Sequence, residues 1–165
     1  MTKPYDLVVI GAGSAGITTA RTAASLGGRV LLVERDRTGG DCLWTGCVPS
    51  KALLAAAAAA HAVRTAGRFG VHAGEPSVDF AAVMAHVRGA QAHIEPVDSP
   101  SSLRAAGIEV RQGTARFTSP STLDVDGQRV RFRAAVVATG SDPVATTAAR
   151  SAASWGRHSP GSARG

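Results

Sequence analysis

A glycine-rich turn near the start of the chain constrains its fold most strongly. The turn GAGSAG (residues 11–16) follows the apolar run LVVI and precedes ITTARTAASLGG, whose small and apolar residues suit a helix that ends at Gly27 and Gly28. A second apolar run, RVLLVE, comes next. Short β-branched runs without polar alternation are typical of strands buried on both faces, so the sequence predicts a parallel βαβ unit.

The spacing of the glycines in this turn is typical of dinucleotide binding. Gly11, Gly13 and Gly16 form the pattern GxGxxG, in which glycine permits a tight turn, close approach of the backbone to a pyrophosphate, and contact between helix and strand. The helix that begins at about Ser14 and Ala15 directs its first backbone amides at the phosphates. We therefore predict a dinucleotide site here; the alternative is a scaffold in which the glycines only pack.

Two charged residues end the second predicted strand. Glu34 stands where a carboxylate accepts hydrogen bonds from a ribose in such sites. Arg35 follows it, either as a contact to a 2′-phosphate or as an ordinary surface arginine. The motif by itself does not distinguish NAD from FAD.

The middle of the chain has helical patterns. We expect a loop over residues 39–51, an alanine-rich helix over about 49–66, and a further helix that Asp79 caps. Proline residues should end that helix near residue 96, before a short helix through Leu103. In the capped helix, the apolar residues at helical spacing should face the core, Met84 among them: Phe80, Val83, Met84 and Val87.

The last third of the chain changes to strand patterns. GIEVRQG, TARFTSP, TLDVDG and QRVRFR indicate short strands of a β-meander, with VDGQ as a hairpin tip, and AAVVATG indicates a further buried strand. After Asp142 the chain has almost no large apolar residue. We expect residues 144–165 to be a disordered tail, and the hypothesis is an out-of-frame or truncated junction.

Charge and hydropathy bear on the class of partner. The formal net charge is +6 and the isoelectric point is about 10.6, yet the basic residues are spread along the chain. Arg129, Arg131 and Arg133 alternate as on the solvent face of a strand, so we expect no nucleic-acid partner. The longest apolar stretch, 52–60, is shorter than a membrane helix, and the start of the chain does not have the pattern of a signal peptide. We expect a soluble, cytoplasmic protein without a membrane partner.

Both cysteines of the chain lie in the stretch GGDCLWTGCVPSK, at positions 42 and 47. The pair could be redox-active, half of a metal site, or coincidental. A metal site needs further ligands, and the histidines are scattered without a second paired motif, so we expect no metal. Redox chemistry fits better, because Cys47 precedes a predicted helix whose N-terminus would stabilise its thiolate. In a reducing compartment a close pair is more often catalytic or metal-binding than structural.

The same stretch resembles the signature GGxCxxxGCxPSK of the class I pyridine nucleotide–disulfide oxidoreductases, which include mercuric reductase, dihydrolipoamide dehydrogenase and glutathione reductase. The resemblance covers about residues 5–143, and it is closest to the mercuric reductase-like and dihydrolipoamide dehydrogenase-like members. It implies an α/β fold: a three-layer FAD/NAD(P)-binding Rossmann-like domain with a parallel sheet and a β-meander, here incomplete at its C-terminal end, over residues 1–143.

The resemblance also implies roles for individual residues. The dinucleotide would be FAD, with the glycines of the turn at its pyrophosphate and Glu34 at its adenosine ribose. Cys42 would be the interchange thiol that attacks substrate, and Cys47 the thiol beside the flavin. Lys51 would lie near the flavin ring, where its charge favours the reduced, anionic flavin. Further contacts to FAD would come from the following positions: Arg35, Gly40, Asp41, Thr114, Ala115, Thr139, Gly140 and Ser141.

Some features depart from the family pattern. Asp41 stands where many members have threonine, and a carboxylate there would repel the flavin phosphates unless it turns away. Trp44 and Thr45 stand where asparagine and a small apolar residue are common, and we expect Trp44 to pack in the core.

Family members continue into an NAD(P)-binding domain with a second glycine motif and a dimerisation domain. This sequence has no second GxGxxG pattern, and we expect both domains to be missing from it. The expectation is therefore an oxidoreductase that passes electrons from NAD(P)H through FAD to the cysteine pair, present as an N-terminal fragment. Its substrate would be a small molecule, a disulfide or a metal ion, and the homodimer of the family would lack its dimer domain. The alternatives are a non-catalytic FAD-binding module and an inactive truncated product.

Overall fold

The computed structural model of the protein describes residues 3–141. Its strands are β1 (Tyr5–Ile10), β2 (Val30–Glu34), β3 (Glu109–Gln112), β4 (Ala115–Ser119), β5 (Thr122–Val125) and β6 (Gln128–Val137). Its helices are α1 (Ser14–Ser25), α2 (Gly40–Trp44), α3 (Cys47–Thr65), α4 (Phe80–Asp98) and α5 (Pro100–Ala105), with a 3₁₀ helix η1 (Ala66–Phe69). The predicted tail, 144–165, lies outside the described residues.

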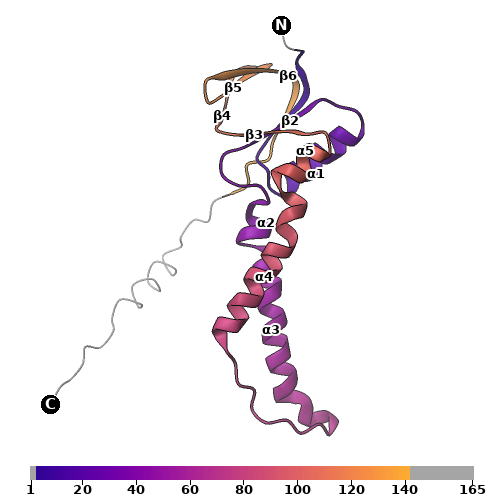
Figure 1. Cartoon of the computed structure of the whole chain (residues 1–165), viewed down its shortest axis with the longest axis vertical. Helices are drawn as coiled ribbons and strands as arrows, with labels where there is room; N and C mark the ends of the chain where they lie inside the picture. The colour runs from indigo at the N-terminus through magenta and orange to yellow at the C-terminus, as the bar shows by residue number, and fades with distance from the viewer. Residues whose placement is uncertain (1–2, 142–165) are drawn as a thin grey trace, which may run out of the picture.

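The strands form one six-stranded sheet in the order β3-β2-β1-β6-β5-β4. The first four strands of that order are parallel, and β1 lies at their centre, with Val8 opposite Leu31 of β2 and Ala135 of β6. The other pairings, β6 with β5 and β5 with β4, are antiparallel. Figure 1 shows that this antiparallel part curls over one face of the parallel strands. The predicted parallel sheet and β-meander are both confirmed.

Two apolar clusters fill the two sides of the parallel strands. One cluster joins the β2 residues Leu31 and Val33 to Leu123 and Phe132 of the antiparallel part. The other packs α1 and α5 against the opposite face, with Ile17 and Leu103 among its members. Each fully buried aliphatic side chain contributes about 1.5–3 kcal/mol. The result is the expected arrangement of three layers: antiparallel strands, parallel strands and helices.

Strand β6 differs from the sequence-based expectation, which divided it into two strands. It is continuous from Gln128 to Val137, and its first part pairs with β5 while its second part pairs with β1. No turn residue interrupts it, so one strand serves both parts of the sheet. As predicted, Arg129, Arg131 and Arg133 are exposed and the alternate residues are buried. The predicted hairpin tip is also confirmed, with Asp126 and Gly127 both at positive φ. Strand β3 belongs to the parallel part rather than to the meander.

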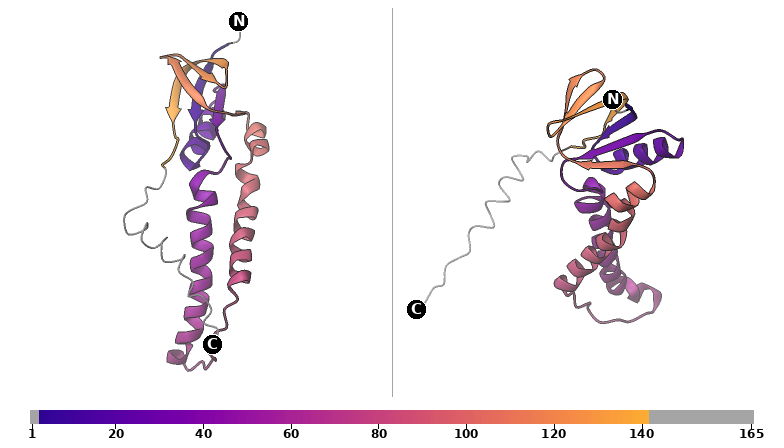
Figure 2. Two further views of the ribbon diagram at one scale, coloured as in Figure 1. Left: turned by 90° about the vertical axis from the view of Figure 1, so that its left-hand side faces the viewer. Right: turned by 45° about the horizontal axis from the view of Figure 1, so that its top comes forward.

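Helices α3 and α4 lie side by side and project away from the sheet (Figures 1 and 2). The cap at Asp79 is confirmed, because its carboxylate accepts a hydrogen bond from the backbone N–H of Ala82. The core prediction for this helix is wrong in part: Val87 is buried, but Phe80 is 65% exposed and Met84 is only half-buried. The helical spacing was right, but at this end α4 has only α3 beside it.

Proline did not end α4 where the sequence predicts. Pro96 lies inside the helix, which continues to Asp98. The proline nitrogen carries no hydrogen, so the bond to the carbonyl of Ala92 is lost, and this disturbance lies close to the C-terminal end of the helix. Ser99 then caps the short helix α5, which begins at Pro100.

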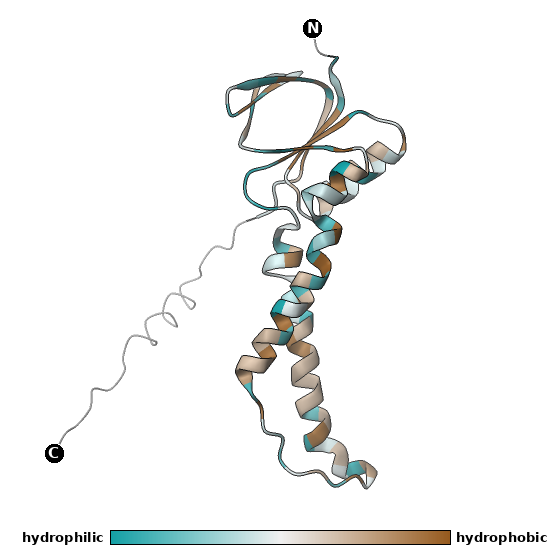
Figure 3. Ribbon diagram, viewed as in Figure 1, coloured by the Kyte–Doolittle hydropathy of each residue, from teal (hydrophilic) through white to brown (hydrophobic). Residues whose placement is uncertain are grey.

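The helical stretch Gly40–Phe69 is long and apolar enough, by length and composition alone, to cross a membrane. Figure 3 shows its apolar character along α3. Nine of its 30 residues are alanine, and only 11% of its most apolar window is buried within the structure. One such helix is weak evidence for a membrane span, and the absence of a membrane partner stays a prediction.

Candidate functional site

The glycine-rich turn connects β1 to α1 and can be formed only by glycine at two of its positions. Gly11 has a φ of 100°, and a side chain there would overlap the carbonyl oxygen of Ala138, which follows β6. A side chain at Gly16 would overlap the carbonyl oxygen of Gly11. These two glycines therefore let α1 and the end of β6 approach the turn closely, as the sequence predicts for contact between helix and strand.

Gly13 is different, because nothing in the described protein requires glycine there. Its φ of −81° and ψ of −172° suit any residue, and a Cβ atom would meet only Gly40 Cα, at 3.8 Å. Gly13 is the N-cap residue of α1, and no side chain caps that helix. The backbone N–H groups of the first turn therefore face outward beside a cavity that Gly13 lines. A ligand that approaches the backbone explains the glycine, and a pyrophosphate fits this site.

Glu34 is fixed by the backbone on both sides. Its carboxylate oxygens accept hydrogen bonds from the backbone N–H groups of Ala12, at 2.6 Å, and Asp36, at 2.9 Å. Its own backbone carbonyl accepts from the N–H of Gly113, which leads into β4. The carboxylate thus lies between the glycine-rich turn and the β3–β4 connection, at the end of β2. A ribose bound there would find an acceptor that is already oriented.

The segment that the sequence analysis predicted as a loop contains the short helix α2 instead. Two glycines dock it on the glycine-rich turn: Gly39 donates its N–H to the carbonyl of Ala12 at 2.8 Å, and a Cβ atom at Gly40 would lie 2.6 Å from Gly13 Cα. Both glycines have positive φ, which favours glycine. The close contact places Asp41, the next residue, beside the same cavity as Gly13.

Asp41 does not turn fully away from that cavity. Its Oδ1 accepts a hydrogen bond from the hydroxyl of Thr45 at 3.3 Å, and its Oδ2 would lie 3.9 Å from a Cβ atom on Gly140. Its backbone carbonyl accepts from the N–H groups of Thr45 and Gly46. The carboxylate therefore remains at the rim, where phosphate oxygens would meet its negative charge unless they bind on the α1 side.

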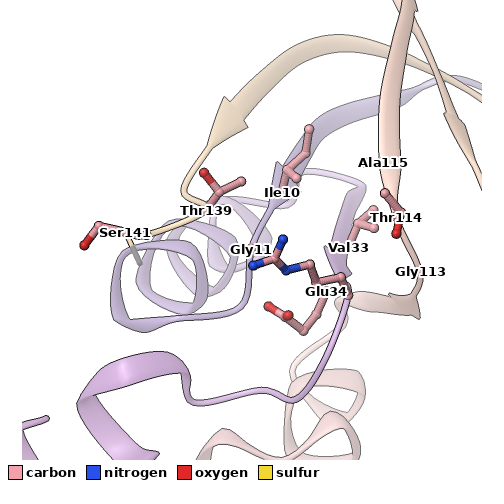
Figure 4. Close-up of a pocket in the computed structure, with 11 residues that line it drawn as sticks. Ile10, Gly11, Val33, Glu34, Gly113, Thr114, Ala115, Thr139 and Ser141 are labelled. Carbon is pink, nitrogen blue, oxygen red and sulfur yellow. The ribbon is translucent and has the colours of Figure 1, made fainter. Parts of the chain in front are cut away.

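Most of the predicted cofactor residues line two adjoining cavities. Figure 4 shows the first, of about 290 Å³, between the ends of β1 and β2, the start of β4 and the segment after β6. The second, of about 250 Å³, lies on the α2 side. Between them they are lined by these predicted residues: Gly11, Gly13, Glu34, Arg35, Gly40, Asp41, Thr114, Ala115, Thr139, Gly140 and Ser141. Ligands of doubly wound sheets bind at this edge, beyond the carboxyl ends of the strands.

The two cysteines lie outside these cavities. Cys42 is half-buried in α2, Cys47 is the exposed first residue of α3, and both thiols are free. Lys51, one turn after Cys47, is exposed as well. Helix α3 begins two residues before the predicted start, so Cys47 lies within its first turn. Within residues 3–141, no cluster of His, Cys, Asp and Glu is placed to hold a metal ion.

Several residues that line these cavities were not predicted from the sequence. Trp44 is half-buried rather than in the core: its Nε1–H donates to the carbonyl of Thr38 at 2.8 Å, and Arg37 stacks over its ring at 3.9 Å. Trp44, Arg37 and Asp36 line the α2-side cavity and a third one of about 330 Å³. Asp36 and Arg37 directly follow Glu34 and Arg35 in the sequence, so their place beside the end of β2 could have been predicted. Only the fold shows that α2 packs next to them.

A comparison with known protein families shows the family to which this chain belongs. A profile described as pyridine nucleotide-disulphide oxidoreductase matches residues 5–158. The chain belongs to this family. The match includes the glycine-rich turn, the cysteine stretch and β6, and it continues into residues 144–158, which we had set apart as a tail.

Relatives within the family support the same assignment. The chain is 40% identical to a mercuric reductase of Streptomyces lividans over 147 residues, which cover 86% of the chain and 31% of the relative. It is 37% identical to a dihydrolipoyl dehydrogenase of Thermus scotoductus over 142 residues, which cover 86% of the chain and 30% of the relative. The chain thus spans about a third of the length of these curated relatives.

A solved structure shares the fold. The HOCl-induced flavoprotein disulfide reductase RclA from Escherichia coli superimposes with a TM-score of 0.69 at 26% sequence identity, over 87% of this chain and 30% of that one. The family and this structure together imply a flavin as the cofactor class. The residues around Gly13 and Glu34 fit such a group.

Proposed function

We propose that this chain is the FAD-binding part of a flavin-dependent disulfide oxidoreductase and that Cys42 and Cys47 are its redox-active pair. The observation that carries the proposal is Gly13, a glycine that no protein contact requires and that lines the cavity at the N-terminus of α1. The oriented carboxylate of Glu34 and the family match support the same proposal.

Each part of the site would bind one part of the cofactor. The first backbone amides of α1 would donate to the pyrophosphate, and the Glu34 carboxylate would accept from a ribose hydroxyl. The adenine end would occupy the cavity beside Thr114 and Ala115, and the segment 139–141 would flank the phosphates. When bound, FAD would supply two-electron redox chemistry between NAD(P)H and the cysteine pair.

The cysteine pair would carry the electrons to substrate. Reduction of a Cys42–Cys47 disulfide takes up two electrons and two protons and gives two thiols. With a disulfide substrate, the Cys42 thiolate would attack one sulfur and release the first substrate thiol. Cys47 would then attack the mixed disulfide, which re-forms the Cys42–Cys47 bond and releases the second thiol. Lys51, four residues after Cys47, would favour the reduced, anionic flavin through its positive charge.

The test is a visible absorption spectrum of the purified chain after incubation with FAD and desalting, before and after addition of NADH or NADPH. We expect a retained flavin band, and a Gly13→Ala variant should retain less. A wild-type chain that retains no flavin would contradict the FAD proposal. Titration of the free thiols before and after a flavin-dependent reduction would test the cysteine pair separately.

A second candidate is a FAD-binding module without turnover. One observation favours it: residues 3–141 contain one GxGxxG pattern, the turn at 11–16, so they offer one dinucleotide site of this kind. If FAD occupies that site, the nicotinamide needs another. A flavin band that NAD(P)H bleaches supports the oxidoreductase, and a band that stays oxidised supports the module. The cytoplasmic location and the homodimer stay predictions.

A further inference from the structure

A cavity of about 400 Å³ lies at the opposite end of the sheet from the proposed cofactor site. Its lining comes from the start of β1, the residue before β2, β3 and the first half of β6, and it shares no lining residue with the cavities around Glu34. The apolar cluster between β2 and the antiparallel strands separates the two ends. The volume is within the range of small-molecule sites.

Cationic side chains make up most of this lining. Five of its eight residues are basic: Lys3, Arg29, Arg111, Arg129 and Arg131. The others are Tyr5, Gln128 and Val130. Arginine and lysine on four different segments meet here, although in the sequence they are spread over more than a hundred positions. Because these cations are far apart in the sequence, no basic site could be predicted from it.

Two of the arginines are held in place by the protein. The guanidinium of Arg29 stacks over the Tyr5 ring, 4.1 Å from its centroid, and donates to the backbone carbonyl of Lys3. The guanidinium of Arg111 forms an ion pair with Glu109 at 2.8 Å. Because these contacts use part of each guanidinium and fix its plane, less side-chain entropy is lost when an anion binds.

The acidic residues near the cavity do not neutralise it. Glu109 binds Arg111 and accepts a hydrogen bond from the Tyr5 hydroxyl at 2.5 Å. Asp6 accepts from the backbone N–H of Arg29 and pairs with Arg133, which does not line the cavity. Glu109 therefore offsets part of the charge of Arg111 and Arg29, and Asp6 offsets part of that of Arg29 and Lys3, which leaves the lining with more positive than negative charge.

Two of the remaining cations have a carboxylate nearby: Lys3 interacts electrostatically with Asp6, and Asp124 of β5 is the cross-strand partner of Arg129. Lys3, Arg129 and Arg131 are exposed, and none of them forms an ion pair with another residue in the part of the chain that the structure describes. Arg129 and Arg131 project from the same face of β6, because they are two residues apart on a strand. The cavity thus combines two fixed guanidinium groups with three exposed cations that form no ion pair within residues 3–141.

We propose that this cavity binds a small anion that carries two or more phosphate groups, such as a polyphosphate or a nucleoside polyphosphate. Arginine dominates the lining, and its planar fork binds phosphate oxygens in pairs. A single phosphate would engage one or two of the cations, whereas a chain of phosphates can reach both the Arg29–Arg111 side and the Arg129–Arg131 side. The site is independent of the proposed flavin chemistry.

Isothermal titration of the full chain with sodium tripolyphosphate, at constant ionic strength, tests the proposal. The variant Arg129→Gln/Arg131→Gln removes two lining charges from an exposed strand face, where it should not disturb folding. The control variant Arg88→Gln/Arg116→Gln removes two exposed charges that line none of these cavities. We expect binding to weaken at least about tenfold in the first variant and less than about twofold in the control.

Three results would overturn the proposal: no binding by the wild-type chain, equal weakening in both variants, or citrate binding as tightly as tripolyphosphate. Equal weakening would mean general charge attraction without a site. Tight citrate binding would mean that the cavity does not distinguish phosphates from carboxylates. ATP titrated into the wild-type chain and into Arg129→Gln/Arg131→Gln distinguishes the two sources of the phosphate chain. Only the binding that the variant loses is assigned to this cavity, because ATP can also enter the proposed dinucleotide site. If that binding is tighter for ATP, the cavity is a nucleotide site, and if it is tighter for tripolyphosphate, it is a polyphosphate site; either supports the shared chemistry.

Discussion

The side-chain amide of Gln91 donates a hydrogen bond to the backbone carbonyl oxygen of Trp44, the last residue of α2, at 2.9 Å. It also donates to the carbonyl of the preceding residue, Leu43, at 3.1 Å. The last carbonyls of a helix have no partner within that helix, so Gln91 satisfies two of them from α4. Through this contact the projecting helix α4 fixes the helix that carries Cys42.

Replacing Gln91 with methionine should loosen α2 without removing bulk. Methionine retains the length of the side chain but has no donor, so two helix-end carbonyls lose their partner, at a cost of about 1 kcal/mol each. We expect amide hydrogen exchange of residues 40–46 to become at least about fivefold faster. The exposed residue His93 on the same helix provides the control, since His93→Ala should leave exchange in α2 unchanged. Unchanged protection in Gln91→Met would show that α2 does not depend on this contact.

Replacement by alanine should lower FAD affinity at Gly13 and stability at Gly16. At Gly16 the added methyl group overlaps the Gly11 carbonyl, so the free energy of unfolding should fall by about 2 kcal/mol or more. At Gly13 the backbone angles tolerate alanine and the nearest atom is 3.8 Å away, so stability should change by less than about 1 kcal/mol. There we expect FAD affinity to fall at least about tenfold instead. Chemical denaturation measures the stability of both variants, and flavin fluorescence titration measures their FAD affinity. Unchanged FAD affinity in Gly13→Ala would contradict the pyrophosphate site.

Serine at either cysteine should separate cofactor binding from electron transfer. Neither Cys42 nor Cys47 lines the cavities that we assign to FAD, so both variants should retain the flavin as the wild-type chain does. Neither can form the intramolecular disulfide, so reduction of the chain should yield no additional pair of thiols. The flavin absorbance and a thiol titration of the same samples check this, and loss of flavin in Cys42→Ser would mean that the thiol contributes to cofactor binding.

The hydrogen bond from Tyr5 to Glu109 should make stability depend on pH at both extremes. Burial raises the pKa of Tyr5, and its bond to Glu109 raises it further. Burial pushes the pKa of Glu109 upward, but hydrogen bonds from Tyr5 and Arg111 outweigh it and hold that pKa below its ordinary value. The Glu109 contribution is therefore present above the carboxyl's unfolded pKa and is lost as the pH falls through its lower folded value. The Tyr5 contribution is present below the ordinary tyrosine value and is lost as the pH rises through its raised folded one.

Tyr5→Phe tests this coupling. The variant removes the hydroxyl, so the pKa of Glu109 should move back toward its ordinary value, and the loss of stability in acid should become shallower. Denaturant unfolding between about pH 3 and 7 and the chemical shift of the Glu109 carboxyl report the two effects. An acid profile identical to that of the wild-type chain would mean that other carboxylates, such as Asp6 with its lowered pKa, dominate the transition.

The sequence predicted the parallel unit and the cofactor turn because their signals are local. Gly11, Gly13, Gly16 and Glu34 lie within one βαβ unit, so spacing along the chain determines their placement in space. The predictions that failed depend on contacts between distant segments. The half-buried position of Trp44 depends on the contact between its ring and Arg37. Phe80 is exposed because, among the described elements, α3 is the helix beside the outer end of α4. The basic cavity could not be predicted either, because its cations come from segments that only the sheet brings together.

Strand β6 has a consequence for how the domain unfolds. Its first half is hydrogen-bonded to β5 and its second half to β1, with Phe132 opposite Tyr5 at the point where the two pairings meet. Separating the antiparallel layer from the parallel one would require disrupting a continuous strand at a buried position. The two layers should therefore melt in one cooperative transition, and a chain cut between them would leave neither half with a complete hydrophobic interior.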